Sequence, residues 1–178
     1  MSEAAFVTGL ERNADVVQMS SYAPLFGHVE AWQWTPNLIW FDNLRSFGTP
    51  SYYVQKVFSV NRGRRILPVS LGEGGTKVPG DLYASAASGG AGGGVILKLV
   101  NTSPARRTVR VELAGLGGVG RTGRAVVLTA PDLKAENSLE EPTKIAPRES
   151  LFPAGGGAFD YTLAPSSLTV LRVSGAAR

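Results

Sequence analysis

The sequence predicts a mostly β protein, in which a short α/β part (residues 1–62) precedes an antiparallel β-sandwich (residues 63–178). Two observations support this prediction. Eleven of the 15 Phe, Trp and Tyr residues lie in the first part, whereas glycine runs are concentrated in the second. In the second part, short apolar stretches also recur at regular spacing between Gly and Pro turns, which is typical of antiparallel sandwiches or barrels.

Two helices are expected in the first part. Residues 2–12 have apolar positions on one side at helical spacing, and Ser2 is a suitable N-cap. The second helix should begin at Thr49 and Pro50. A threonine side chain can accept a hydrogen bond from the first turn, and proline at the first helical position loses no hydrogen bond.

Two strands are expected between these helices. Residues 16–23 have the composition of a buried strand that ends at Pro24, and residues 37–43 have that of a second, shorter strand. Helix, strand, long loop and helix make a piece of an α/β fold. This piece is too small to close a sheet by itself.

In the second part, apolar and polar residues alternate with the two-residue period of β-strands. In residues 107–113, Val109, Val111 and Leu113 should face the core, and the polar residues between them should face water. We expect strands at residues 94–101, 107–113, 124–129, 158–163 and 168–173, with weaker candidates at 66–71 and 81–86. The glycine run at 89–94 is best interpreted as a hairpin loop, since the strand-to-helix context of a phosphate-binding loop is missing.

Composition excludes several classes of function. The chain has no cysteine and a single histidine, His28, so disulfides, thiolate metal sites and multi-histidine metal sites are excluded. No apolar run approaches the ~20 residues of a membrane-spanning helix, and no export signal is recognisable at the start. The basic residues are scattered instead of clustered with stacking aromatics. We therefore expect no metal, cofactor, nucleic-acid or membrane partner, and the compartment stays open.

Several motifs in order carry a resemblance to a known family. The most telling are SYAPLF at 21–26, WTPNLIWFDN at 34–43 and GTPSYYVQKVFS at 48–59. Further matching segments lie at 3–15, 128–142 and 163–172. Together they closely resemble the α-L-arabinofuranosidases of glycoside hydrolase family 51, over essentially the whole chain.

The resemblance implies a retaining glycosidase that removes terminal arabinofuranosyl groups from arabinose-containing plant polysaccharides and oligosaccharides. Such an enzyme has a (β/α)8 barrel followed by a β-sandwich, and both catalytic glutamates lie upstream of the segments matched here. Residues 1–62 would then be the C-terminal remnant of the barrel, and residues 63–178 a jelly-roll-like sandwich. We expect no catalytic residue in this chain and no hydrolysis by it alone.

The upstream catalytic barrel is the partner that the resemblance implies. Without it, the remnant should be poorly ordered, adhere to the sandwich or self-associate, whereas residues 64–178 could fold alone. An alternative from another class is a free-standing, non-catalytic carbohydrate-binding or accessory sandwich. Nothing in the second part suggests chemistry, so we expect it to support the barrel.

By the resemblance, residues 24–49 form the loop after the eighth barrel strand. This loop should border the sugar site, because loops that follow the strands form the active face of such barrels. In this loop and at its end, the candidate substrate-binding residues are His28, Glu30, Trp32, Trp34 and Thr49. Aromatic rings stack on sugar C–H faces, and polar tips pair with hydroxyls. The alternatives are that the tryptophans fix the loop to the barrel rim and that Thr49 only caps its helix. Trp40 is expected to be a packing residue.

Glu30 has no acidic partner nearby in the sequence. Retaining hydrolysis requires two carboxyl groups about 5–5.5 Å apart. Glu30 is therefore assigned to substrate binding and not to catalysis.

Overall fold

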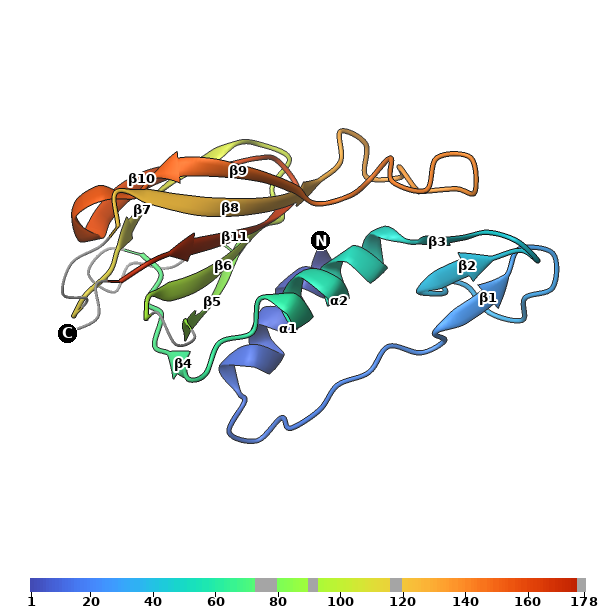
Figure 1. Ribbon diagram of the computed structural model, residues 1–178, viewed down its shortest axis with the longest axis horizontal. Coiled ribbons are helices and arrows are strands. Elements are labelled where there is room, and N and C mark those ends of the chain that lie inside the picture. The colour runs from blue at the N-terminus through green and yellow to red at the C-terminus, as the bar shows by residue number, and fades with distance from the viewer. Residues whose placement is uncertain (73–79, 90–92, 116–119, 176–178) are drawn as a thin grey trace.

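The computed structural model describes residues 1–72, 80–89, 93–115 and 120–175. In chain order, the elements are α1 (Ser2–Arg12), β1 (Phe26–His28), β2 (Ile39–Phe41), β3 (Ser46–Gly48), α2 (Pro50–Val60), β4 (Ile66–Leu67), β5 (Leu82–Ser88), β6 (Val95–Asn101), β7 (Arg107–Glu112), β8 (Thr122–Thr129), β9 (Arg148–Pro153), the 3-10 turn η1 (Gly155–Gly157), β10 (Ala158–Leu163) and β11 (Ser167–Val173). Figure 1 shows their arrangement.

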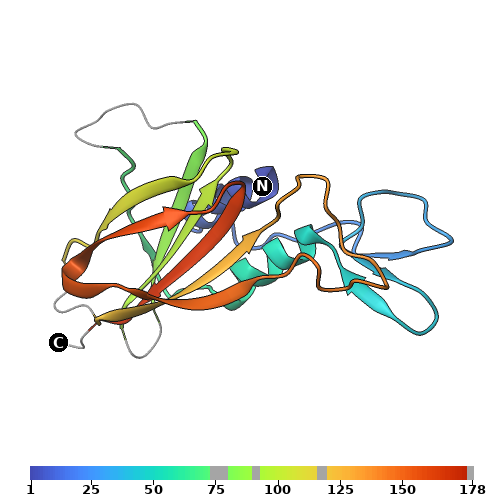
Figure 2. The ribbon, with the colours of Figure 1, turned by 90° about the horizontal axis from the view of Figure 1, so that it is seen from above.

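The strands from β4 onward form a two-layered antiparallel sandwich. One layer is a six-stranded sheet with the order β4-β5-β6-β11-β8-β9, and the other is the pair β7–β10. Helices α1 and α2 pack on the six-stranded sheet (Figures 1 and 2). The mostly β, sandwich-containing fold class is confirmed, and the described residues contain no closed barrel.

Two apolar clusters hold the layers together. The first lies between the two sheets and includes Leu97, Leu99, Val111, Phe159, Leu163 and Leu171. The second joins the helices to the opposite face of the six-stranded sheet and includes Val7, Val54, Val57, Phe58, Ile96, Val100, Val126, Leu168 and Val170. Because both faces of this sheet are covered, β6 is buried at every position and shows no alternation of apolar and polar residues.

Polar contacts also tie the helices to the sheet. Glu11 in α1 forms an ion pair with the fully buried Lys98 of β6, and the Ser85 hydroxyl donates to the same carboxylate. Beyond the end of α2, the Arg172 guanidinium of β11 donates to Asn61 Oδ1 at 2.7 Å. Thus the first part of the chain contacts the sandwich through apolar and charged groups together.

Both predicted helices are confirmed, with one correction at a cap. Thr49 caps α2 as expected, its hydroxyl accepting from the Tyr52 N–H at 3.3 Å, and Pro50 is the first helical residue. The prediction that Ser2 is the N-cap of α1 is wrong. Met1 occupies that position without a side-chain hydrogen bond, and Ser2 is the first residue of the helix.

The strand expected at residues 16–23 is wrong. After a turn that closes on Asn13, this segment is mostly exposed, and its residues belong to no strand. A strand must satisfy its N–H and C=O groups on a neighbouring strand, and no described strand pairs with these residues. The first strand begins later, as β1, which pairs in parallel with β2.

The strand at 37–43 is confirmed as the shorter β2, and the five main strands of the second part are confirmed as β6, β7, β8, β10 and β11. The candidate at 81–86 is confirmed as β5, and that at 66–71 is reduced to the two residues of β4. In the glycine run, the Gly89 N–H donates to the Gly94 carbonyl and closes the β5–β6 hairpin, while residues 90–92 lie outside the described part. The short strand β3 and the edge strand β9 were not expected.

Candidate functional site

Residues 24–49, called the aromatic segment from here on, extend beyond the N-terminal end of α2. They contain the small sheet β1–β2–β3, whose first pair is parallel and second antiparallel. The loop that joins β8 to β9, residues 130–147, reaches out from the sandwich toward the same region (Figures 1 and 2). The aromatic segment and this loop are far apart in the sequence, and they meet at the start of α2.

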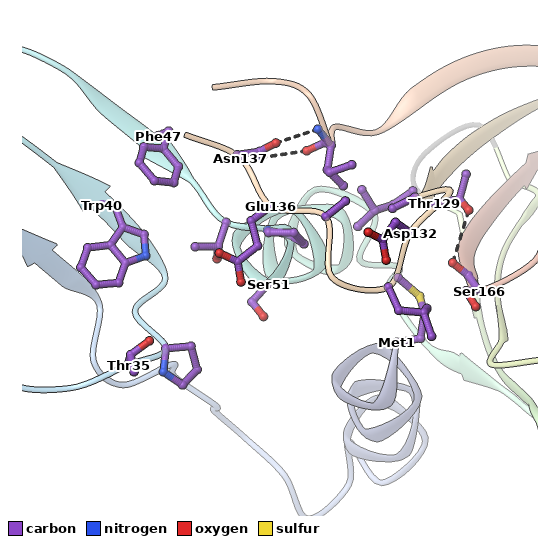
Figure 3. A pocket seen from close by; sticks show the side chains of 18 of the residues that line it. Met1, Thr35, Trp40, Phe47, Ser51, Thr129, Asp132, Glu136, Asn137 and Ser166 are labelled. Carbon is purple, nitrogen blue, oxygen red and sulfur yellow. Dashed lines mark hydrogen bonds between the residues drawn. The ribbon is translucent and has the colours of Figure 1, made fainter. Parts of the chain in front are cut away.

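A cleft of about 530 Å³ lies between them. Trp32, Trp40 and Phe47 line it from the aromatic segment, and Asp132 and Glu136 line it from the 130–147 loop. The start of α2 and the end of β8 contribute hydroxyl-bearing side chains, Thr49, Ser51 and Thr129. Figure 3 shows Trp40 and Phe47 on one side of this space and Asp132 on the other.

Asn137 joins the two walls of the cleft. Its side chain is 5% exposed, and its amide donates to the Gly48 carbonyl at 2.8 Å and to the Ile145 carbonyl at 3.0 Å. Its carbonyl accepts from the Ile145 N–H at 2.6 Å. Gly48 is the last residue of β3, so this one side chain connects the sandwich loop to the aromatic segment just before α2.

Two of the five predicted binding residues line the cleft. Trp32 is 53% exposed and packs edge-to-face against Trp40, with ring centroids 6.2 Å apart. Thr49 also lines the cleft, but its hydroxyl donates to the Leu38 carbonyl at 2.9 Å while it accepts from the Tyr52 N–H. Thus the capping role of Thr49 is directly visible.

The other three predicted residues lie outside the cleft lining. His28 Nδ1 accepts from the Glu30 N–H at 3.2 Å, and its ring meets Phe41 edge-on at 5.3 Å. Glu30 is exposed, and Trp34 is 69% exposed. The backbone beneath Trp34 is held by Asn37, whose amide donates to the Trp34 carbonyl.

Most of the lining was not predicted, including Trp40, Asp132 and Glu136. Trp40 was expected only to pack, yet it faces the cleft beside Trp32. Asp132 and Glu136 come from the second part, where no chemistry was expected. The one available signal was their position in the family-like motif at 128–142; the sequence contained nothing to indicate that this loop meets the aromatic segment.

The charged side chains of the cleft are acidic. Its described lining includes two carboxylates and no Lys, Arg or His. Both Asp132 and Glu136 are exposed. A carboxylic acid that donates a proton at neutral pH is normally held in an apolar environment, which neither residue has. Among the described residues, no three His, Asp or Glu side chains come together as a metal site would require.

The β2–β3 turn is stabilised electrostatically. The Asp42 carboxylate accepts from the N–H groups of Leu44 and Arg45 at 2.7 and 2.6 Å and pairs with the Arg45 guanidinium at 3.0 Å. The two backbone hydrogen bonds, followed by the Arg45 side chain, lower the pKa of Asp42 below 3.8. Asp42 thus keeps β2 and β3 in register beside the cleft.

The fold and the cleft define a composite module, an antiparallel β-sandwich with a helical and aromatic extension. Comparison with known proteins gives the family. The model described as "Alpha-L-arabinofuranosidase C-terminal domain" matches residues 1–167. The chain therefore belongs to the family of C-terminal domains of α-L-arabinofuranosidases, as its motifs predicted. In the part that the structure describes, neither helix has the length and apolarity to span a membrane.

Similar curated proteins come from fungi and plants. A probable α-L-arabinofuranosidase A of Aspergillus terreus is 39% identical over 173 residues, 96% of this chain and 26% of that protein. α-L-Arabinofuranosidase 1 of Arabidopsis thaliana is 36% identical over 174 residues, 95% of this chain and 25% of that protein. The chain thus spans about a quarter of the length of the curated relatives it matches.

Solved structures agree with this assignment. The arabinose-bound MgGH51 α-L-arabinofuranosidase superposes with a TM-score of 0.88 at 36% identity, covering 97% of this chain and 27% of that one. The GH51 arabinofuranosidase of Xanthomonas axonopodis has the same fold, with a TM-score of 0.75 at 24% identity over 96% of this chain and 34% of that one.

Proposed function

We propose that this chain acts as the C-terminal portion of a retaining α-L-arabinofuranosidase, joined to an upstream catalytic barrel. The observation that carries this proposal is the distribution of exposed apolar side chains. Among the described residues, nine of the twelve large exposed hydrophobic residues lie in residues 1–62: Phe6, Val16, Met19, Leu25, Phe26, Trp32, Trp34, Leu44 and Val60. Such a concentration of exposed apolar side chains in one part of a chain suits a surface that a partner covers.

The free edge of the small sheet β1–β2–β3 also supports the upstream barrel as the partner. In the described chain, β1 pairs with β2 on one side only. An exposed strand edge carries N–H and C=O groups that another strand can satisfy. A parallel pair such as β1–β2 fits a larger sheet in which further strands of the barrel precede β1.

In this arrangement the aromatic segment would border the sugar site. Trp32 and Trp34 would stack on sugar rings, and His28 and Glu30 would hydrogen-bond sugar hydroxyls. Thr49 would act mainly by positioning the start of α2, because its hydroxyl already serves Leu38 and Tyr52. The substrates would be polysaccharides and oligosaccharides that carry terminal arabinofuranosyl groups.

The two carboxyl groups for hydrolysis would come from the barrel. Retaining cleavage needs one protonated and one ionised carboxyl about 5–5.5 Å apart. Asp132 and Glu136 share the cleft of this chain, but both are exposed, so neither has the enclosure of a catalytic acid. We therefore propose that the 178 residues alone hydrolyse no glycoside.

A chimaeric enzyme tests this function. Residues 1–178 would replace the matching C-terminal segment of the Aspergillus terreus relative, and release of a chromogenic arabinofuranoside would be measured. We expect the chimaera to be active and the truncated relative to be inactive. A chimaera with a cooperative melting transition but no turnover would contradict the proposal.

The isolated chain serves as the control. It should release no chromophore from the same substrate. Turnover by the isolated chain that disappears in Glu30→Gln or Glu136→Gln would show that it holds its own catalytic group. Without a barrel, the exposed apolar surface would also favour association of two copies, which sedimentation velocity at rising concentration would detect.

A further inference from the structure

Building on the proposed function, we propose that the cleft between the aromatic segment and the 130–147 loop is itself a sugar-binding subsite. It would take an uncharged oligosaccharide portion of the substrate, beyond the terminal arabinofuranosyl group. The sandwich would supply part of this subsite through Asp132 and Glu136. The sandwich then binds substrate in addition to supporting the barrel.

The shape and apolar side of the cleft fit a carbohydrate. Its volume of about 530 Å³ falls within the ~300–1,000 Å³ of typical small-molecule sites. Trp32 and Trp40 meet edge-to-face, so their ring planes are nearly perpendicular, at 87°. Two amphipathic aromatic side chains in this arrangement offer surfaces for the C–H faces of sugar rings.

The polar side of the cleft selects for neutral sugars. Asp132 and Glu136 are acceptors, and carboxylates form stronger hydrogen bonds with hydroxyl donors than neutral acceptors do. One Asp132 oxygen already accepts from the Lys134 N–H at 2.9 Å, which holds the turn and leaves the second oxygen for a ligand. The two carboxylates would repel a uronic acid, and the described lining has no Lys, Arg or His side chain to offset that repulsion.

The two walls are held in place before any ligand binds. Asn137 follows Glu136 directly, and its three hydrogen bonds fix this part of the loop to Gly48 and Ile145. The backbone beside Glu136 is therefore tied to the end of β3 by the Asn137–Gly48 hydrogen bond. Such preorganisation reduces the ordering cost of binding.

The three tryptophans of the chain, residues 32, 34 and 40, all lie in the aromatic segment, so tryptophan fluorescence, excited selectively over tyrosine, reports on this region alone. We would titrate the chain with a neutral arabinoxylan oligosaccharide and follow tryptophan emission and heat. We expect saturable binding with a dissociation constant of about 1 mM. An oligosaccharide that carries glucuronic acid in the corresponding place should bind at least about tenfold more weakly.

Variants on the sandwich side make the test specific. Glu136→Ala and Asp132→Ala should each weaken binding by about tenfold, because a charge-assisted hydrogen bond is lost. Glu141→Ala removes an exposed acid of the same loop that does not line the cleft and that pairs with Lys144 of that loop, and should change the dissociation constant by less than about twofold. Circular dichroism would establish that each variant keeps its fold.

Three results would overturn the inference: no saturable binding up to about 10 mM, equal effects of Glu136→Ala and Glu141→Ala, or no effect of either cleft carboxylate. These outcomes are separable from failure of the proposed function. An active chimaera whose Glu136→Ala variant keeps its KM on the oligosaccharide would remove the subsite and leave the enzyme assignment standing.

Discussion

The carboxylate of Glu11, in the last turn of α1, is ion-paired with Lys98, whose side chain is 0% exposed in the middle of β6. The ammonium group also lies 5.3 Å from the centre of the Phe58 ring on α2. One buried charge thus contacts both helices and the six-stranded sheet. The pair joins residues 87 positions apart and crosses the boundary between the two predicted parts of the chain.

Removal of one partner of this pair should be strongly destabilising. Glu11→Ala leaves the Lys98 ammonium buried without its counter-charge, and we expect the free energy of unfolding to fall by about 3 kcal/mol. Urea unfolding of the isolated chain would measure the change. The double variant Glu11→Met/Lys98→Met should recover most of the loss, because apolar side chains of similar size suit this site. A double variant no more stable than Glu11→Ala would contradict this view of the pair.

Lys98 should also make stability depend on pH in the alkaline range. Burial, opposed by Glu11, lowers the pKa of Lys98 below its ordinary value of 10.5. Between that lowered pKa and 10.5 the unfolded chain binds more protons than the folded one, so the free energy of unfolding should rise with pH. Burial raises the pKa of Tyr161 and acts in the opposite direction.

The contribution of Lys98 is therefore measured as a difference in the free energy of unfolding between the unchanged protein and Lys98→Met. Urea unfolding at several pH values between about 8 and 10.5 gives both free energies. We expect the free energy of unfolding of the unchanged protein to rise relative to that of Lys98→Met as pH rises. If the two free energies change in parallel with pH, Lys98 does not titrate differently in the folded and unfolded states.

Thr169 offers a stabilising substitution. Its hydroxyl is buried in β11, and the described residues provide no hydrogen-bond partner for it. Thr169→Val keeps the shape and removes the unsatisfied group, so the free energy of unfolding should rise by about 1 kcal/mol. Thr129→Val is the matched control. The Thr129 hydroxyl donates to the Pro165 carbonyl at 2.9 Å, and its loss should lower stability by about 1 kcal/mol.

Asn137 should control the local stability of the cleft. Asn137→Ala leaves Gly48 and Ile145 with buried backbone groups that lose their partners, at a cost of about 1–3 kcal/mol. Hydrogen exchange at the Ile145 amide should accelerate more than exchange in β6. Asn137→Asp keeps an acceptor for the Ile145 N–H and should protect that amide better than alanine does. Equal acceleration throughout the sheet would indicate global destabilisation instead.

Separation of the two parts should expose the second apolar cluster. The sequence suggested that residues 64–178 could fold alone, but α1 and α2 cover Ile96, Val100 and Leu168 on the six-stranded sheet. We now expect this fragment to bind an apolar dye and to associate, in contrast to the same sandwich with its helices present. Dye fluorescence and gel filtration of both proteins would decide this, and a monomeric fragment without dye binding would favour the earlier expectation.

Much of the chain was predictable from local pattern. The helix at Thr49–Pro50 and strand β7 follow from capping chemistry and from strict alternation, both of which operate over a few neighbouring residues. The strand prediction for residues 16–23 is wrong because it rested on local composition alone. Their composition suits a strand, but strand formation depends on a partner that the described chain does not provide.

By itself, the sequence determined the family, both helices, the main strands of the second part and the concentration of aromatic residues before the sandwich. Only the tertiary structure decided that β6 is buried on both faces, that Glu11 meets Lys98, and that Asp132 and Glu136 come to lie in a cleft with Trp32. The physical reason is range. Propensity, capping and periodicity operate between near neighbours, whereas a site built from residues about 100 positions apart exists only once the layers pack.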